Sequence, residues 1–219
     1  MLRCAYVALR MHNVFVDKRG KALATVALDK QDVLEVLLRS HEAYFDVTRD
    51  YAHAGRDFAG YAEFRSHSAQ YVLVKRAKLW EADAFEYIFF DMVDQVDGAW
   101  VDEAYRFMTT EAISKVVPDQ NHMMSFISLV AIADSVTEDA RTKVRKARFR
   151  KNFKLGFRGW ADLRMAVIDL ASMDVVTNGM GKEMKPTLHS CLQAAQERAQ
   201  RSEERRVGKE CRSRWSPYH

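Results

Sequence analysis

The stretch Met123-Met-Ser-Phe-Ile-Ser-Leu-Val-Ala-Ile-Ala133 decides the fold class of this chain. It is almost continuously apolar, and only Ser125 and Ser128 interrupt it. A strand that is covered on both faces has this composition, although periodicity alone leaves a buried helix open as the alternative. We therefore expect a sheet with packing layers on both sides, to which the flanking segments contribute.

The segments before this stretch predict two helices and three strands. Asp29 is placed to cap a helix. The apolar residues of that helix follow helical spacing, namely Val33, Leu34, Leu37 and Leu38. Three runs rich in aromatic and β-branched residues follow at residues 57–65, 70–75 and 85–92, and their closeness in the chain favours an antiparallel meander. Asp97-Gly98 then opens a second helix, which ends before Pro118.

The segments after the stretch predict a short helix, three strands and a last helix. Thr137, followed by two acidic residues, caps the short helix. Residues 149–158 alternate between a largely apolar and a largely cationic face, which indicates a strand. The phenylalanines also recur every four residues, so a helix stays open, but Gly156 and Gly159 count against it. Residues 163–170 and 174–178 predict two strands joined by a turn, and the last helix runs from about Pro186 to about Gln200.

Together these segments predict an α+β domain, with a mixed or mainly antiparallel sheet of six to seven strands and about four packed helices. Helices precede and interrupt the strands without a strict β-α-β alternation, which favours α+β over α/β. No repeat or linker marks a boundary, so residues 29–200 are expected to form a single domain. Residues 1–28 are expected to be a private extension or a mis-assigned start.

The last nineteen residues, 201–219, look like a sequencing-library adapter read in frame. They are therefore expected to be an artefactual, disordered tail, with a native basic tail as the alternative. This tail holds six Lys and Arg residues against three Glu residues, so it contributes three of the four net positive charges of the chain. The remainder is near neutral, and its overall charge does not predict a nucleic-acid partner.

Composition and motifs also restrict the chemistry. Outside the tail only Cys4 and Cys191 remain, and neither has a CxxC or metal-finger spacing, which is typical of a cytoplasmic protein with reduced thiols. No stretch reaches the roughly 18 apolar residues of a membrane span. The sequence has no HExxH pattern, phosphate-binding glycine loop or GxSxG elbow. We therefore predict no cofactor, no metal and no membrane partner.

Four stretches resemble an uncharacterised bacterial family that is known only as a domain of unknown function. They are Ala43-Tyr-Phe-Asp-Val47, Lys75-Arg-Ala-Lys-Leu-Trp-Glu81, Phe153-Lys-Leu-Gly-Phe-Arg-Gly-Trp-Ala-Asp-Leu-Arg164 and Val175-Val-Thr-Asn-Gly-Met-Gly-Lys-Glu183. The resemblance covers about residues 29–185 and implies no catalytic residue.

Nine cations within 18 residues form the strongest candidate for a site: Arg141, Lys143, Arg145, Lys146, Arg148, Arg150, Lys151, Lys154 and Arg158. Four aromatic residues are interleaved with them or follow them: Phe149, Phe153, Phe157 and Trp160. A cationic face can neutralise phosphates, and aromatic rings beside it can stack on unpaired bases. We therefore predict a non-enzymatic binding or accessory domain for nucleic acid or another polyanion, through Arg150, Lys154, Arg158 and Arg164. A solvated charged surface is the alternative.

A metal-dependent nuclease is the enzymatic alternative. The order helix, three strands, helix, strand is that of the restriction-endonuclease-like core, in which two acids and a lysine converge on Mg²⁺. Glu183-Met184-Lys185 has the E-x-K form, and Asp169 precedes it at the end of a strand. A second set would converge across the first meander, from Glu63, Glu81 and Glu86 with Lys75 or Lys78. Topology alone is an analogy and does not establish the activity.

Overall fold

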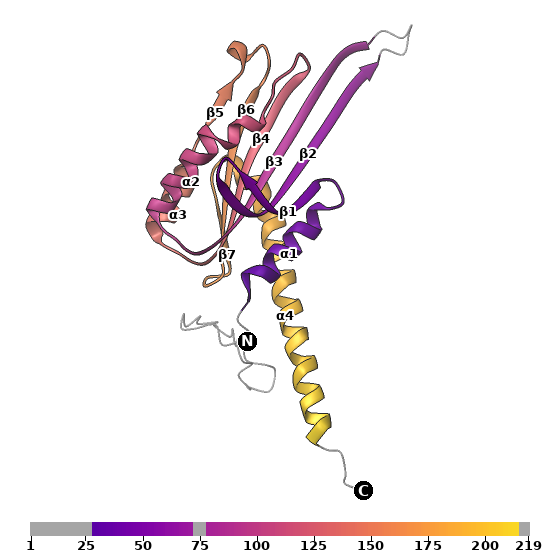
Figure 1. Ribbon diagram of the computed structural model, residues 1–219, viewed down its shortest axis with the longest axis vertical. Coiled ribbons are helices and arrows are strands. Elements are labelled where there is room, and N and C mark those ends of the chain that lie inside the picture. The colour runs from indigo at the N-terminus through magenta and orange to yellow at the C-terminus, as the bar shows by residue number, and fades with distance from the viewer. Residues whose placement is uncertain (1–27, 72–77, 215–219) are drawn as a thin grey trace, which may run out of the picture. The chain divides into compact units, whose positions relative to one another are not determined.

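The computed structural model describes residues 28–71 and 78–214 (Figure 1); side chains are described for residues 28–65, 85–202 and 205. Residues Leu28–Arg198 form one compact unit. Beyond this unit, the described chain continues as helical backbone from residue 199 to Arg214.

The compact unit is built on a seven-stranded mixed sheet with the order β1-β2-β3-β4-β6-β5, in which β7 also pairs with β6. Its strands are β1 Asp46–His53, β2 Arg56–Tyr71, β3 Lys78–Val96, β4 His122–Val136, β5 Arg150–Asn152, β6 Trp160–Asp169 and β7 Asp174–Thr177. β1, β2 and β3 form an antiparallel meander, while β4 is parallel to both β3 and β6. β5 and β7 are antiparallel to β6. The predicted α+β class with a mixed sheet is confirmed.

The described residues form four α-helices: α1 Lys30–His41, α2 Gly98–Thr110, α3 Glu138–Lys146 and α4 Lys185–Arg214. The predicted caps of the first three are confirmed, because the side chains of Asp29, Asp97 and Thr137 accept hydrogen bonds from backbone N–H groups of the first turns. None of the described helices is both long and apolar enough to cross a membrane.

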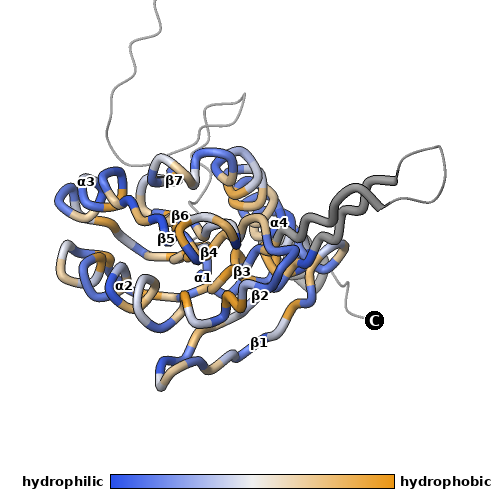
Figure 2. Tube along the Cα trace, turned by 90° about the horizontal axis from the view of Figure 1, so that it is seen from above, coloured by the Kyte–Doolittle hydropathy of each residue, from blue (hydrophilic) through white to orange (hydrophobic). Residues whose placement is uncertain are grey.

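Each face of the sheet has its own hydrophobic core. α2 and α3 lie side by side over one face, where Met108 and Val144 pack with Phe89 and Leu129 (Figure 1). α1 and the first turns of α4 pack on the other face, over a cluster that includes Leu37, Phe90, Val130, Ile132, Ile168 and Leu192. The hydrophobic segments accordingly gather on the central strands (Figure 2). β4 supplies alternate residues to the two cores, which confirms the prediction of a strand covered on both faces.

Three element predictions are corrected. β1 was not expected, because as an edge strand it exposes most of its side chains and carries little hydrophobic pattern. A two-residue turn at Ala54-Gly55, with both φ angles positive, joins it to β2. The run expected at residues 70–75 continues β2 as far as it is described. The last helix does not end at Gln200, because α4 runs on to Arg214.

Candidate functional site

The cationic strand expected over residues 149–158 is mostly absent. Only Arg150–Asn152 is a strand, and a 3₁₀ turn follows at Lys154–Gly156. Lys154 and Leu155 have φ angles of 45° and 57°, and Gly156 has 93°, so the chain turns sharply where an extended segment was predicted. Backbone hydrogen bonds from Phe153 N to Gly159 O and from Arg158 N to Phe153 O close this loop on itself. The prediction of one continuous amphipathic strand is therefore wrong.

The loop is held against the start of β4. The buried His122 hydrogen-bonds the carbonyl oxygen of Arg158 through Nδ1 at 2.7 Å and the hydroxyl of Ser125 through Nε2 at 2.8 Å. Gly159, with a φ of 68°, lies so close to β4 that a Cβ atom there would be 1.9 Å from the carbonyl oxygen of Met123. A glycine is required at this contact, and the loop is a defined structure and not an irregular excursion.

Gly159→Ala is therefore expected to destabilise the protein by about 3 kcal/mol, from the positive φ together with the overlap against β4. Chemical denaturation of the variant and the parent measures this. Gly179→Ala is the matched control, because Gly179 has helical dihedrals and no neighbouring atom within 4 Å of its added Cβ. Equal stabilities for the two variants would show that the loop does not make the close contact.

Two apolar side chains of this loop face solvent. Leu155 is 95% exposed and Phe157 is 88% exposed, whereas Phe149 and Phe153 pack against the core as expected. The apolar residues of this segment therefore do not share one buried face, as they would on the predicted amphipathic strand. Val117, which precedes β4, and Met123, at the start of β4, are also exposed, and the carbonyl oxygen of Pro118 accepts a hydrogen bond from Arg158.

Of the four residues predicted to bind a polyanion, three are held by contacts within the fold. Arg150 donates through Nε and Nη2 to the buried Asp162 at 2.7 Å each, and this hydrogen bond raises the pKa of the guanidinium. Arg158 donates to the backbone carbonyl of Pro118 at 3.3 Å. Arg164 is only 8% exposed. Lys154 is the one of the four that has no such partner among the described residues, and it is exposed in the loop.

Arg164 is part of a buried polar cluster on β6. Its guanidinium lies 3.4 Å above the ring of Phe126. Nη1 donates to Glu86 Oε1 at 3.0 Å, and the same oxygen accepts a hydrogen bond from Ser128. Nη2 donates at 3.2 Å to Glu183, whose side chain is 84% exposed, and Nε is buried without an acceptor. This cluster neutralises the cation inside the fold and removes it from the surface.

Five exposed cations remain along the chain from the end of α3 through β5 to the loop. They are Arg145, Lys146, Arg148, Lys151 and Lys154. Within the described residues, none of them has a carboxylate in ion-pair distance, which sets them apart from Lys143, whose Nζ lies near two aspartates. β5 is the outer strand of the sheet, so this cationic edge is not covered by a further strand among the described elements.

The three residues of the alternative nuclease prediction each contact different partners and do not contact one another. Asp169 accepts hydrogen bonds from Arg141 and Ser172 at the end of β6. Glu183 pairs with Arg164, and Lys185 lies 3.4 Å from Asp174. Over the side chains that the structure describes, no group of three or more His, Cys, Asp and Glu residues could hold a metal ion.

Glu63 and Glu86, the glutamates of the meander whose side chains are described, do not come together either. Glu63 accepts a hydrogen bond from the hydroxyl of Tyr61 and lies 3.8 Å from Lys115. Glu86 is opposite Phe64 in the register, one position along from Glu63, so the two carboxylates extend from opposite faces of the sheet. The side chains of Glu81, Lys75 and Lys78 lie outside the described residues.

Comparison with known proteins gives one match. The model of the family described as "Domain of unknown function (DUF8052)" matches residues 29–190. Searches of curated proteins and of solved structures return no match.

Proposed function

The chain belongs to this family of unknown function, DUF8052, and we propose that it is a cytoplasmic, non-enzymatic binding domain that holds single-stranded nucleic acid along the cationic edge. The observation that carries the proposal is the combination of exposed, unpaired cations and exposed apolar side chains in one ordered segment. Phe157 and Leu155 are exposed in the loop, and Lys151 and Lys154 precede them on the chain.

Single-stranded nucleic acid complements both the exposed cations and the exposed apolar side chains of this surface. Lysine and arginine neutralise phosphates and release counterions, and the bases of a single strand can stack on an exposed aromatic ring. A continuous amphipathic strand would have turned the aromatic rings into the core, where no stacking would be possible. Because Phe157 is 88% exposed, a ring is accessible beside the cations. Arg150 and Arg164 are then supports of the sheet, Lys154 keeps its predicted role as a phosphate-binding residue, and Lys151 is added to it.

The proposal is tested with a fluorescently labelled single-stranded oligonucleotide and anisotropy titrations between about 50 and 200 mM salt. The double variant Lys151→Gln/Lys154→Gln is expected to bind more weakly and to reduce the salt slope by about 1.4, since each neutralised phosphate of a single strand contributes about 0.7. Phe157→Ala is expected to weaken binding about tenfold with an unchanged salt slope, because stacking is not ionic.

Matched controls separate this surface from general charge. Lys182→Gln/Arg198→Gln removes the same charge at exposed positions outside the loop, and Tyr44→Ala removes a ring that is 78% exposed elsewhere. Both controls are expected to bind like the parent protein. If the controls and the loop variants weaken binding equally, or if the parent shows no binding at low salt, the proposal is wrong.

A further inference from the structure

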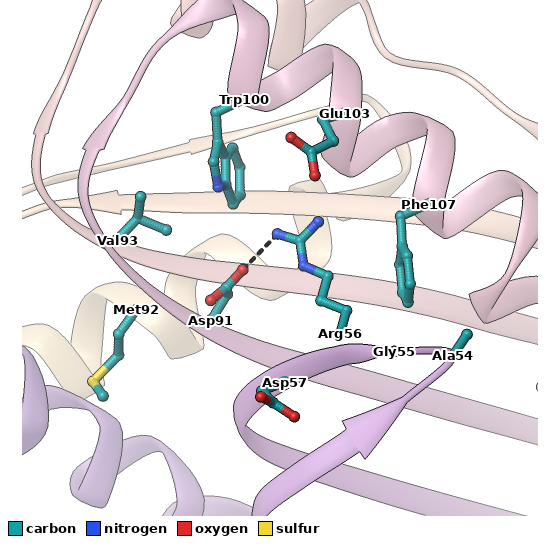
Figure 3. Close-up of a pocket in the computed structure, with 10 residues that line it drawn as sticks. All are labelled: Ala54, Gly55, Arg56, Asp57, Asp91, Met92, Val93, Trp100, Glu103 and Phe107. Atoms are coloured by element: carbon teal, nitrogen blue, oxygen red, sulfur yellow. Dashed lines mark hydrogen bonds and ion pairs between the residues drawn. The ribbon is translucent and has the colours of Figure 1, made fainter.

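A second site lies between the β1–β2 turn and α2, separate from the cationic edge. A cleft of about 600 Å³ opens there, and its lining includes Gly55, Arg56, Asp91, Trp100, Glu103 and Phe107 (Figure 3). This volume is in the range of pockets that hold small molecules. Neither the sequence patterns nor the family match assigns a role to these residues.

The guanidinium of Arg56 is the fixed centre of the cleft. Nη2 donates to Asp91 Oδ2 at 2.7 Å. The guanidinium carbon lies 5.3, 5.8 and 5.4 Å from the ring centroids of Phe58, Trp100 and Phe107. The ion pair is shielded, since the side chains of Arg56 and Asp91 are only 20% and 14% exposed. Contacts on several sides therefore hold the guanidinium in one orientation before any ligand arrives.

Most donors of this guanidinium remain unused. Arginine has five N–H bonds, and the described residues provide an acceptor only at Nη2. Neither Nε nor Nη1 is among the buried side-chain atoms that lack a partner, so within the described residues neither is sealed off from solvent. Figure 3 shows the carboxylate of Glu103 directed from α2 towards Arg56, without an ion pair between them, and Trp100 and Phe107 on either side. The cleft thus presents one donor group, two aromatic walls and two carboxylates without an ion pair among the described residues, Asp57 and Glu103, of which Glu103 is the one directed towards Arg56.

We infer that this cleft binds a free α-amino acid with an aromatic side chain. The carboxylate of the ligand accepts hydrogen bonds from the guanidinium N–H groups of Arg56 that Asp91 leaves unused, its ammonium faces Glu103, and its ring packs against Trp100 and Phe107. A purely anionic ligand would meet Asp91 and Glu103, and a purely cationic one would meet Arg56. A zwitterion complements both signs of charge, and complementary charge selects among ligands of equal size.

Isothermal titration calorimetry of the full chain with L-phenylalanine tests this inference. Saturable binding is expected, and phenethylamine and 3-phenylpropionate, which each lack one charged group, are expected to bind at least about tenfold more weakly. Equal binding of phenethylamine would show that Arg56 does not recognise the carboxylate. Absence of heat with all three compounds would remove the site.

Two variants assign the roles. Glu103→Gln is expected to weaken L-phenylalanine about tenfold, and because Glu103 is exposed the variant keeps its fold. Glu111→Gln, an exposed acid just after α2 and outside the cleft, is the control that binds like the parent. Arg56→Lys retains the charge but loses the fork of donors, and it is expected to lose at least as much affinity. Unchanged affinity in both cleft variants would overturn the inference, and oligonucleotide binding is expected to be unaffected in all three variants.

Discussion

Asn178→Ala is expected to lower the free energy of unfolding by about 4 kcal/mol, because four buried hydrogen bonds depend on this one side chain. Its Oδ1 accepts from the backbone N–H groups of Met165 at 3.1 Å and Gly181 at 2.8 Å. Its Nδ2 donates to the carbonyl oxygens of Ala147 at 3.1 Å and Leu163 at 2.9 Å. Asn178 has no exposed surface, so water cannot replace the lost partners.

Urea denaturation followed by circular dichroism measures the effect. Asn178→Asp tests which half of the amide matters, since a carboxylate keeps the acceptors but cannot donate to Ala147 and Leu163. It is also expected to destabilise strongly, because it places a charge in the core. Asn152→Ala, on the exposed β5, is the control and should change stability by less than about 0.5 kcal/mol. A loss below about 1 kcal/mol for Asn178→Ala would contradict the role of Asn178 as the junction of β6, β7 and the end of α3.

Arg164→Leu is expected to cost about 3–5 kcal/mol, because it leaves Glu86 as an unpaired carboxylate on the sheet. Glu86 is 18% exposed at the side chain, and after the change only Ser128 would bond the oxygen that it now shares with the guanidinium. The double variant Arg164→Leu/Glu86→Leu is expected to regain most of the lost stability, since it removes both charges and leaves apolar groups.

Glu183, in the same polar cluster, provides the control variant for Arg164→Leu. Glu183 also contacts Arg164, but its side chain is 84% exposed, so Glu183→Gln is expected to cost less than about 1 kcal/mol. Urea denaturation of the three variants gives the three values on one scale. If Arg164→Leu were no more destabilising than Glu183→Gln, the buried pair with Glu86 would not stabilise the fold.

Local sequence signals predicted the helices and the central strand because the relevant interactions are local. Asp29, Asp97 and Thr137 cap helices through N–H groups only two or three residues away. The apolar run from Met123 to Ala133 predicted β4 because a strand covered on both faces must be apolar throughout.

The loop after β5 could not be predicted in this way. An alternation of apolar and cationic residues is the same in a strand and in the observed turn, so the pattern at residues 149–158 does not distinguish them. The conformation of the loop is determined by two tertiary contacts. One is the close approach of Gly159 to Met123, and the other is the hydrogen bond between His122 and Arg158, which are 36 residues apart in the chain. The exposure of Leu155 and Phe157 follows from that tertiary contact.

The candidate site was predictable only as a segment. The sequence located the cations correctly but could not identify which of them find carboxylates, because the partner of Arg164 is Glu86, 78 residues earlier. For Arg150 the partner Asp162 is closer, yet it becomes adjacent only when β5 pairs with β6. Pairing of this kind depends on strand register and not on local composition.

The position of β4 between β3 and β6 has a consequence for synthesis on the ribosome. The meander and α2 precede β4, so its pairing with β3 can form as soon as β4 emerges. The opposite edge stays without its partner until Trp160–Asp169 has also been translated, and during that interval unpaired N–H and C=O groups flank one of the most apolar segments of the chain. Nascent chains arrested between β4 and β6 are therefore expected to be the aggregation-prone species in the biogenesis of this protein.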